Sequence, residues 1–233
     1  MSKVFCWDID GTLLTTGKAG IFAYEEAVFE LFNIKIDLWE LETEGLIDPK
    51  IAAKILKQCL IEPSEQAIHR LLEIYGQRLP ICLNRKNGYV MKGVKEFIEK
   101  SSLYGKCFHM LLTGNTLSGA KAKLEYYGLI NYFPEMGAFS DGMTRREEIA
   151  EKAFQIAQDK FKLKDVKHMF VIGDTPYDIL CGKAIGAKTI SVATGKYSLA
   201  DLAKCGPDYN VECIDWTLLN QVFNNKQESG LNI

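Results

Sequence analysis

The chain has 233 residues and a mass of 26.2 kDa, which is the length of one or two domains and enough to bury a substantial core. Hydrophobic residues make up 47% of it and charged residues 25%. This composition is that of a folded globular protein and excludes a disordered, collagen-like or coiled-coil chain. Lys and Arg number 28 against 30 Asp and Glu, a net charge of −2, so the composition indicates no partner of nucleic acid or anionic membrane.

The cysteine pattern indicates the redox compartment of the protein. None of the seven forms a C-x-x-C pair, which favours free thiols in a reducing compartment over disulfides or a zinc site; they are Cys6, Cys59, Cys82, Cys107, Cys181, Cys205 and Cys213. The apolar run at the start is too short for a signal peptide, and no stretch approaches the ~18 apolar residues of a membrane span. We therefore expect a cytoplasmic protein.

Short apolar runs alternate with longer segments of helical periodicity along most of the chain. The runs predict buried strands at 4–7, 108–112, 169–172 and 189–192. Between them, apolar residues recur at helical spacing, as in Val94, Phe97 and Ile98. The alternation of strand and helix predicts an α/β fold, a Rossmann-like, doubly wound parallel sheet with helices on both faces.

One interval interrupts this alternation. Between Gly17 and Gly88 the sequence contains three stripes of helical spacing and no convincing strand, which predicts a smaller all-helical domain inserted after the first strand. Gly17 and Asn87-Gly88 are candidate hinges at its two ends. The predicted domains are an α/β core at 1–16 and 89–223, a helical insert at 17–88 and a flexible tail at 224–233.

The first predicted strand runs directly into the sequence DIDGTLL. Asp8 and Asp10 therefore stand where a buried strand ends, the edge at which open α/β sheets bind ligands, and Gly11 permits a tight turn there that Thr12 can cap. The glycine spacing fits neither a calcium-binding EF-hand loop nor a Walker A loop. A lone D-x-D is as readily a solvated acidic turn, so further residues must decide.

Two more predicted strands also end in polar residues. One ends at Thr113, Gly114 and Asn115, and another at Asp174, with Asp178 four residues later. Since parallel strands deliver their carboxyl ends to one edge, these groups are expected to converge with Asp8 and Asp10. Four carboxylates repel one another unless a cation lies among them, and an oxygen-only donor set favours Mg²⁺.

These three segments together resemble the motifs of the haloacid dehalogenase (HAD) superfamily, in its phosphatase branch. DIDGTLL resembles the first motif, LLTGN the second and GDTPYD the fourth, and the resemblance covers residues 3–18 and 90–215. The helical insert stands where relatives such as phosphoglycolate phosphatases and β-phosphoglucomutases carry a cap over the site. The resemblance implies that Asp8 is the nucleophile that forms an aspartyl phosphate and that Asp10 is the general acid and base.

The resemblance also implies roles for the neighbouring residues. Mg²⁺ would be held by Asp8, Asp174 and the backbone carbonyl of Asp10, with Asp178 supporting the site from behind. Thr113 would hold the phosphoryl oxygens. The residues implied to bind substrate around it are Gly11, Thr12, Gly114 and Asn115.

The third motif of the family is a Lys or Arg near a helix start, some 20 to 30 residues before the acid of the fourth. The candidates are Arg145, Arg146 and Lys152, which precede Asp174 by 29, 28 and 22 residues. We favour Arg146, since it is followed by Glu147-Glu148 as in many relatives, but the sequence leaves all three open.

The expected activity is Mg²⁺-dependent hydrolysis of a small phosphorylated metabolite, because a closing cap limits substrate size. Many relatives carry a Gly-basic-Thr-Asp segment in the cap, whereas this chain has Gly45-Leu46-Ile47-Asp48, which disfavours glycolate-type and bisphosphorylated substrates. A β-phosphoglucomutase-like phosphotransferase and a catalytically silent binding protein remain alternatives. Dehalogenation is disfavoured because such members lack an aspartate like Asp10. The expected partners are a small metabolite and, in a homodimer, a second copy; a monomer is equally compatible.

Overall fold

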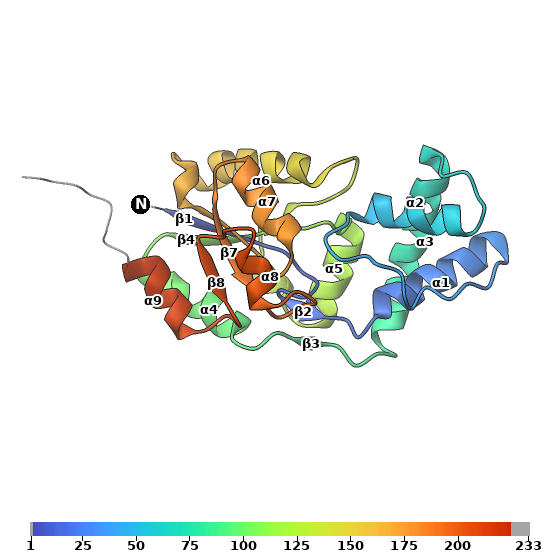
Figure 1. The fold of residues 1–233 in the computed structure, drawn as a ribbon, viewed down its shortest axis with the longest axis horizontal. Coiled ribbons are helices and arrows are strands. Elements are labelled where there is room, and N and C mark those ends of the chain that lie inside the picture. The colour runs from blue at the N-terminus through green and yellow to red at the C-terminus, as the bar shows by residue number, and fades with distance from the viewer. Residues whose placement is uncertain (1, 225–233) are drawn as a thin grey trace, which may run out of the picture.

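A parallel sheet forms the centre of the protein. The computed structural model describes residues 2–224, so the predicted tail lies outside the described residues except for Asn224. In this part of the chain six parallel strands follow the order β5–β4–β1–β6–β7–β8 (Figure 1). Their bounds are β1 Lys3–Trp7, β4 Cys107–Leu112, β5 Gly137–Ala138, β6 Met169–Gly173, β7 Lys188–Val192 and β8 Tyr209–Val211. All four predicted strands are present, each within one residue of its expected ends.

Helices cover both faces of the sheet because its strands are apolar on both faces. In β1, Val4 and Cys6 point to one face and Phe5 and Trp7 to the other, and all four are fully buried. The Phe5 face packs against α4 (Val94–Ser101), α5 (Leu117–Tyr126) and α9 (Trp216–Asn224). The Val4 face packs against α6 (Arg146–Phe161) and α7 (Pro176–Ala184). The predicted fold class is confirmed.

A second hydrophobic cluster holds the helical insert together. The insert contains α1 (Ala19–Phe32), α2 (Asp48–Gln58) and α3 (Glu65–Leu83), which lie at the right of Figure 1, beside the end of the sheet. These are the three predicted stripes. The rings of Tyr24 and Tyr75 stack with centroids 4.0 Å apart and join α1 to α3. The residue boundaries proposed for the domains stay a prediction.

Two short antiparallel strands connect the sheet to the insert. Leu14–Thr15 (β2) pairs with Tyr89–Val90 (β3), so both chain crossings lie side by side. A Cβ placed on Gly17 would lie 2.8 Å from the Asn87 carbonyl oxygen, and one on Gly88 would lie 2.1 Å from that of Thr15. Gly17 therefore packs against Asn87, and Gly88 packs against Thr15 of β2. The sequence did not predict β2, β3, β5 or β8, because two or three residues are too few to show a periodicity.

The remaining elements are connections. They are α8 (Leu199–Ala203) and the short 3₁₀ turns η1 (Ser102–Tyr104), η2 (Ile130–Tyr132) and η3 (Val166–His168). No helix among the described residues is long and apolar enough to span a membrane. All seven cysteines are free thiols.

Candidate active site

The carboxyl edge of the sheet brings the predicted acidic residues together. Asp8 follows β1 and Asp174 follows the neighbouring strand β6, so pairing of these strands places the two side by side. One carboxylate oxygen of each of Asp8, Asp174 and Asp178 lies within 4.8 Å of the other two. The chain turns sharply after Ile9, and Gly11 takes a φ of +85°, a left-handed conformation that suits glycine.

Burial makes charged carboxylates costly at this edge. It raises the pKa of Asp8 to about 7, although Arg146 opposes the shift, and it raises the pKa of Asp174 to about 8, with further contributions from the charges of Asp178 and Asp8. Asp8 is 7% exposed and Asp174 is 3% exposed. Two adjacent buried carboxylates that resist ionisation in this way are stabilised by a bound cation.

The donor set fits Mg²⁺. Carboxylate oxygens are the ligands that this hard ion prefers, and Asp174 is firmly oriented. The Thr12 hydroxyl donates to Asp174 Oδ1 at 3.0 Å. A Cβ on Gly11 or Gly195 would come within 2.4 or 1.8 Å of Asp174 Oδ2, so the backbone of both glycines packs closely around this carboxylate. Asp8 and Asp174 are therefore the residues best placed to hold the ion.

Arg146 supplies the positive charge beside Asp8. It is the first residue of α6 and is 8% exposed, and its Nη2 lies 3.2 Å from Asp8 Oδ1 and pairs with Asp178. Its Nη1 donates to the Gly45 carbonyl at 3.2 Å. Arg145 and Lys152, the other two candidates, are exposed. Of the three, Arg146 alone contacts the predicted nucleophile.

Glu148 closes the start of α6. Arg145 occupies the N-cap position. The Thr144 hydroxyl and N–H both donate to Glu148, at 2.9 and 2.8 Å. The carboxylate of the third helical residue thus closes the helix start, as in a capping box.

Asp178 holds Arg146 and the start of α7. Its Oδ2 accepts hydrogen bonds from the Thr175 N–H at 3.0 Å and the Thr175 hydroxyl at 2.6 Å, and its Oδ1 pairs with Arg146. Both oxygens are therefore in use. This arrangement suits a residue that supports the site from behind, which is the role implied by the resemblance.

The segment after β4 lies on the other side of Asp8. Thr113 is fully buried, and its hydroxyl accepts hydrogen bonds from the Asn115 backbone N–H at 3.3 Å and side-chain Nδ2 at 2.9 Å. A hydrogen bond from Thr113 lowers the pKa of Asp8, against the larger effect of burial. Gly114 packs against the insert, because a Cβ there would lie 2.5 Å from the Leu46 carbonyl oxygen.

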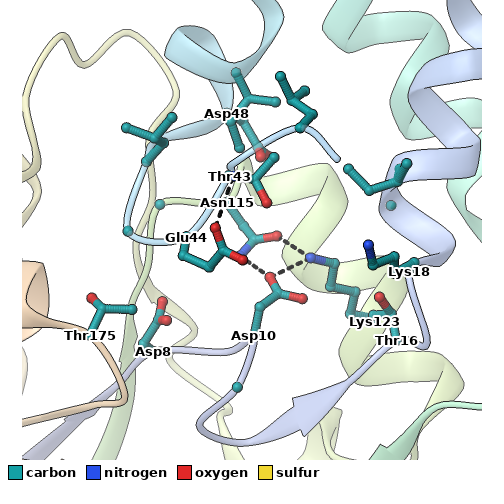
Figure 2. A pocket seen from close by; sticks show the side chains of 18 of the residues that line it. Asp8, Asp10, Thr16, Lys18, Thr43, Glu44, Asp48, Asn115, Lys123 and Thr175 are labelled. Carbon is teal, nitrogen blue, oxygen red and sulfur yellow. Dashed lines mark hydrogen bonds and ion pairs between the residues drawn. The ribbon is translucent and has the colours of Figure 1, made fainter. Parts of the chain in front are cut away.

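Asp10 has a cationic partner that the sequence analysis missed. Lys123 Nζ lies 2.5 Å from Asp10 Oδ2 and 2.6 Å from Asn115 Oδ1, and Asn115 Nδ2 donates to the same Asp10 oxygen at 2.9 Å (Figure 2). Lys123 is only 4% exposed. Its signal in the sequence is its position on α5, where it interrupts the apolar stripe of Ala120 and Leu124.

A loop of the insert closes over these residues. The Asp48 N–H donates to the Gly114 carbonyl at 2.8 Å, and Asp48 Oδ2 accepts from the Thr116 N–H at 2.7 Å. Asp48 is the first residue of α2 rather than its N-cap, a position held by Ile47, so the side chain is free to cross to the core. Burial raises the pKa of Asp48 to about 6, although Lys123 opposes the shift.

The space between this loop and the sheet edge is a cavity of about 270 Å³. Asp8, Asp174 and Arg146 line its core side, and Tyr24 and Asp48 line the side of the insert. Asp10, Asn115 and Lys123 lie between the two sides (Figure 2). The arrangement can hold a phosphoryl group near Asp8 and an organic group beneath the insert.

Comparisons with known proteins identify this architecture. Residues 142–216 match the model of the HAD-hydrolase-like family. A hydrolase from Pseudomonas syringae is 20% identical, with a TM-score of 0.72, over 96% of this chain and 99% of that one. The chain has the haloacid dehalogenase-like fold. The fold that the motif resemblance implies is confirmed.

Two further solved structures share the haloacid dehalogenase-like fold over nearly the whole chain. A HAD hydrolase, family IA, variant 3, from Entamoeba histolytica is 16% identical, with a TM-score of 0.73, over 97% of this chain and 100% of that one. A predicted phosphoglycolate phosphatase from Haemophilus somnus is 17% identical, with a TM-score of 0.67, over 91% and 94%. No curated protein matches the chain.

Within this haloacid dehalogenase-like fold, the residues chosen from the sequence lie close together but make different contacts. Asp8 lies near both Asp174 and Arg146. Thr12 is engaged with Asp174 and Asn115 with Asp10. The roles assigned to all of them in catalysis, substrate binding and metal binding stay predictions.

Proposed function

We propose that the protein is a Mg²⁺-dependent phosphatase that hydrolyses a small phosphorylated metabolite through an aspartyl phosphate on Asp8. The observation that carries the proposal is the meeting of two buried carboxylates, Asp8 and Asp174, with Arg146 Nη2 at 3.2 Å from Asp8 Oδ1. A buried nucleophile beside one cation and one metal-binding partner is the requirement for attack on a phosphate dianion.

In the first step a carboxylate oxygen of Asp8 attacks phosphorus, and the bond from phosphorus to the leaving alcohol oxygen breaks. Arg146 attracts the phosphoryl oxygens and reduces their repulsion by Asp8. Bound Mg²⁺, held by Asp8, Asp174 and the Asp10 carbonyl, would supply the remaining charge compensation. The protonated carboxyl of Asp10 gives its proton to the leaving oxygen, so a neutral alcohol departs.

In the second step Asp10 acts as a base. Its carboxylate removes a proton from water, the resulting hydroxide attacks phosphorus, and the bond between phosphorus and Asp8 breaks to release phosphate. Lys123 and Asn115 hold one oxygen of Asp10. Its other oxygen has no partner among residues 2–224, and the side chain is 45% exposed, so a proton can be exchanged there.

The cavity favours a small substrate, because the insert closes over it and leaves about 270 Å³. A phosphotransferase of the β-phosphoglucomutase type would use the same groups. Free phosphate separates the two activities, since a mutase returns little of it and requires a bisphosphorylated primer.

The proposal is tested by phosphate release from p-nitrophenyl phosphate with Mg²⁺ and with excess EDTA. We expect turnover only with the metal, and a phosphorylated Asp8 in acid-quenched enzyme examined by mass spectrometry. Turnover that persists in Asp8→Asn contradicts the aspartyl-phosphate route. The absence of phosphate release from every phosphomonoester tried would favour the silent binding protein.

A further inference from the structure

The insert side of the cavity holds a polar group that the proposed reaction does not use. Tyr24 lines the cavity and is 3% exposed, and its buried hydroxyl, which lies near the Asp48 carboxylate, forms no hydrogen bond within residues 2–224. Stacking on Tyr75, with ring centroids 4.0 Å apart, fixes the position of the ring. An unpaired buried hydroxyl is costly, so a bound group that pairs with it gains affinity.

Asp48 lies beside this hydroxyl and is held still. Its backbone N–H and its Oδ2 are both bonded to the core, to Gly114 and Thr116. Burial, with Asp48 as the next largest cause, raises the pKa of the Tyr24 hydroxyl well above its usual range. Tyr24 therefore remains a hydrogen-bond donor at neutral pH, and Asp48 offers a carboxylate acceptor next to it.

Among residues 2–224, both lysines that line the cavity already have partners. Lys18 Nζ donates to the Trp39 carbonyl at 2.6 Å and lies 3.9 Å from the centre of the Trp39 ring. Lys123 is engaged by Asp10 and Asn115. The Glu44 carboxylate also lines the cavity (Figure 2), so acidic groups dominate this side.

We infer that Tyr24 and Asp48 determine specificity by binding a hydroxyl group of the leaving alcohol, so that the substrate is a phosphorylated polyol or sugar rather than a phosphorylated carboxylic acid or a bisphosphate. This inference rests on the proposed phosphatase function. A hydroxyl can accept from Tyr24 and donate to Asp48 at the same time, whereas a carboxylate or phosphate only accepts. An anionic group would therefore meet the Asp48 carboxylate in a partly enclosed cavity, where like charges are costly.

The experiment compares phosphomonoesters that differ only by an alcohol or a carboxylate. The pairs are 2-hydroxyethyl phosphate with phosphoglycolate, and glycerol 3-phosphate with 3-phosphoglycerate, each with Mg²⁺ and the wild-type protein. We expect kcat/KM to be at least about tenfold higher for the alcohol of each pair, the effect of one well-placed hydrogen bond. Equal or faster turnover of the acids overturns the inference.

Two variants test whether Tyr24 and Asp48 cause the preference for alcohols over acids. Tyr24→Phe removes only the hydroxyl and is expected to reduce the alcohol-to-acid ratio of kcat/KM about tenfold. Asp48→Asn keeps an oxygen for the Thr116 N–H but removes the charge, and is expected to raise turnover of the acids relative to the alcohols. The matched control is Tyr127→Phe, which removes another buried, unpaired hydroxyl that does not line the cavity.

A loss that is equally large for p-nitrophenyl phosphate and for the alcohols would overturn the assignment of Tyr24. A binding measurement separates this inference from the proposed function. Calorimetric titration of Asp8→Asn, with and without Tyr24→Phe, measures the Kd of glycerol 3-phosphate and 3-phosphoglycerate without turnover. If the wild-type protein releases no phosphate from any ester, the phosphatase proposal fails, yet tighter binding of the alcohol through Tyr24 still supports the inference and tighter binding of the acid refutes it.

Discussion

The two sides of the cavity differ in how their polar groups are satisfied. On the core side the charged groups pair with one another: Arg146 bridges Asp8 and Asp178, although its Nε has no hydrogen-bond partner within residues 2–224, and Thr12 donates to Asp174. On the insert side, the Tyr24 hydroxyl has no partner within residues 2–224, and Asp48 is tied down by the backbone of the core. In the proposed function, the core side would act on phosphorus, whereas the insert side would face the leaving group.

The largest expected effect comes from the proposed nucleophile. Asp8→Asn should reduce kcat by at least about 10⁴-fold, in the range seen when nucleophiles are removed from other enzymes. Because burial raises the pKa of Asp8 to about 7, its charge is costly in the fold, and a neutral amide should leave the free energy of unfolding unchanged or higher. Kinetics and urea unfolding measure both. Asp159→Asn, at an exposed position of α6, is the control.

The core side should also be the more fragile one. Arg146→Ala leaves Asp8 and Asp178 without their shared cation, and we expect a loss of about 3–5 kcal/mol in the free energy of unfolding, as for other broken buried ion pairs. Chemical denaturation checks it. Arg145→Ala, one residue away and exposed, should change stability by less than about 0.5 kcal/mol. Equal effects of the two substitutions would show that Arg146 is not the structural cation.

Lys123 lies between the two sides, and its removal sharpens the comparison. Lys123→Met keeps the buried stem but releases Asp10, so we expect kcat to fall about 10- to 100-fold, within the usual contribution of a positioned acid or base. Stability should change little, because an apolar side chain suits the buried position. Lys121→Met, at an exposed position of the same helix, is the matched control. A rise in KM with unchanged kcat would instead place Lys123 in substrate binding.

The smallest expected effect is a change in thermal stability with pH and with Mg²⁺. Burial raises the folded-state pKa values of Asp8 and Asp174 to about 7 and about 8, above the value of about 3.8 that an unfolded Asp has. Their contribution to stability is therefore fully present below pH 4 and is lost as the pH rises through 8. The Tm of the metal-free protein should fall over this range, and the increase in Tm caused by Mg²⁺ should be larger at pH 8.5 than at pH 6. Asp174→Asn should reduce this pH dependence.

The core was predictable because local signals and the geometry of parallel strands agree. The apolar run before Asp8 and the one before Asp174 each end in an acid, and neighbouring parallel strands necessarily bring those ends together. Arg146 was one of three candidates in the sequence, because two arginines and a lysine lie at or near the start of one helix and only burial against Asp8 separates them.

Lys123 and Asp48 were not predicted, since their partners lie 113 and 68 residues away in the chain. A lysine on an apolar helical stripe is ordinarily read as a surface residue, and an Asp before a Pro as a helix cap. Lys123 is buried on α5, which packs against α3, and the insert places Asp48 on Thr116.

The amino-acid sequence by itself determined the α/β fold, the helical insert and the acids at the ends of the strands, because periodicity and turn chemistry act over a few residues. The tertiary structure alone decided which cation reaches Asp8, that Lys123 holds Asp10, and that Tyr24 faces the cavity without a partner. These depend on contacts between segments that lie far apart in the chain, whose relative placement no local pattern encodes.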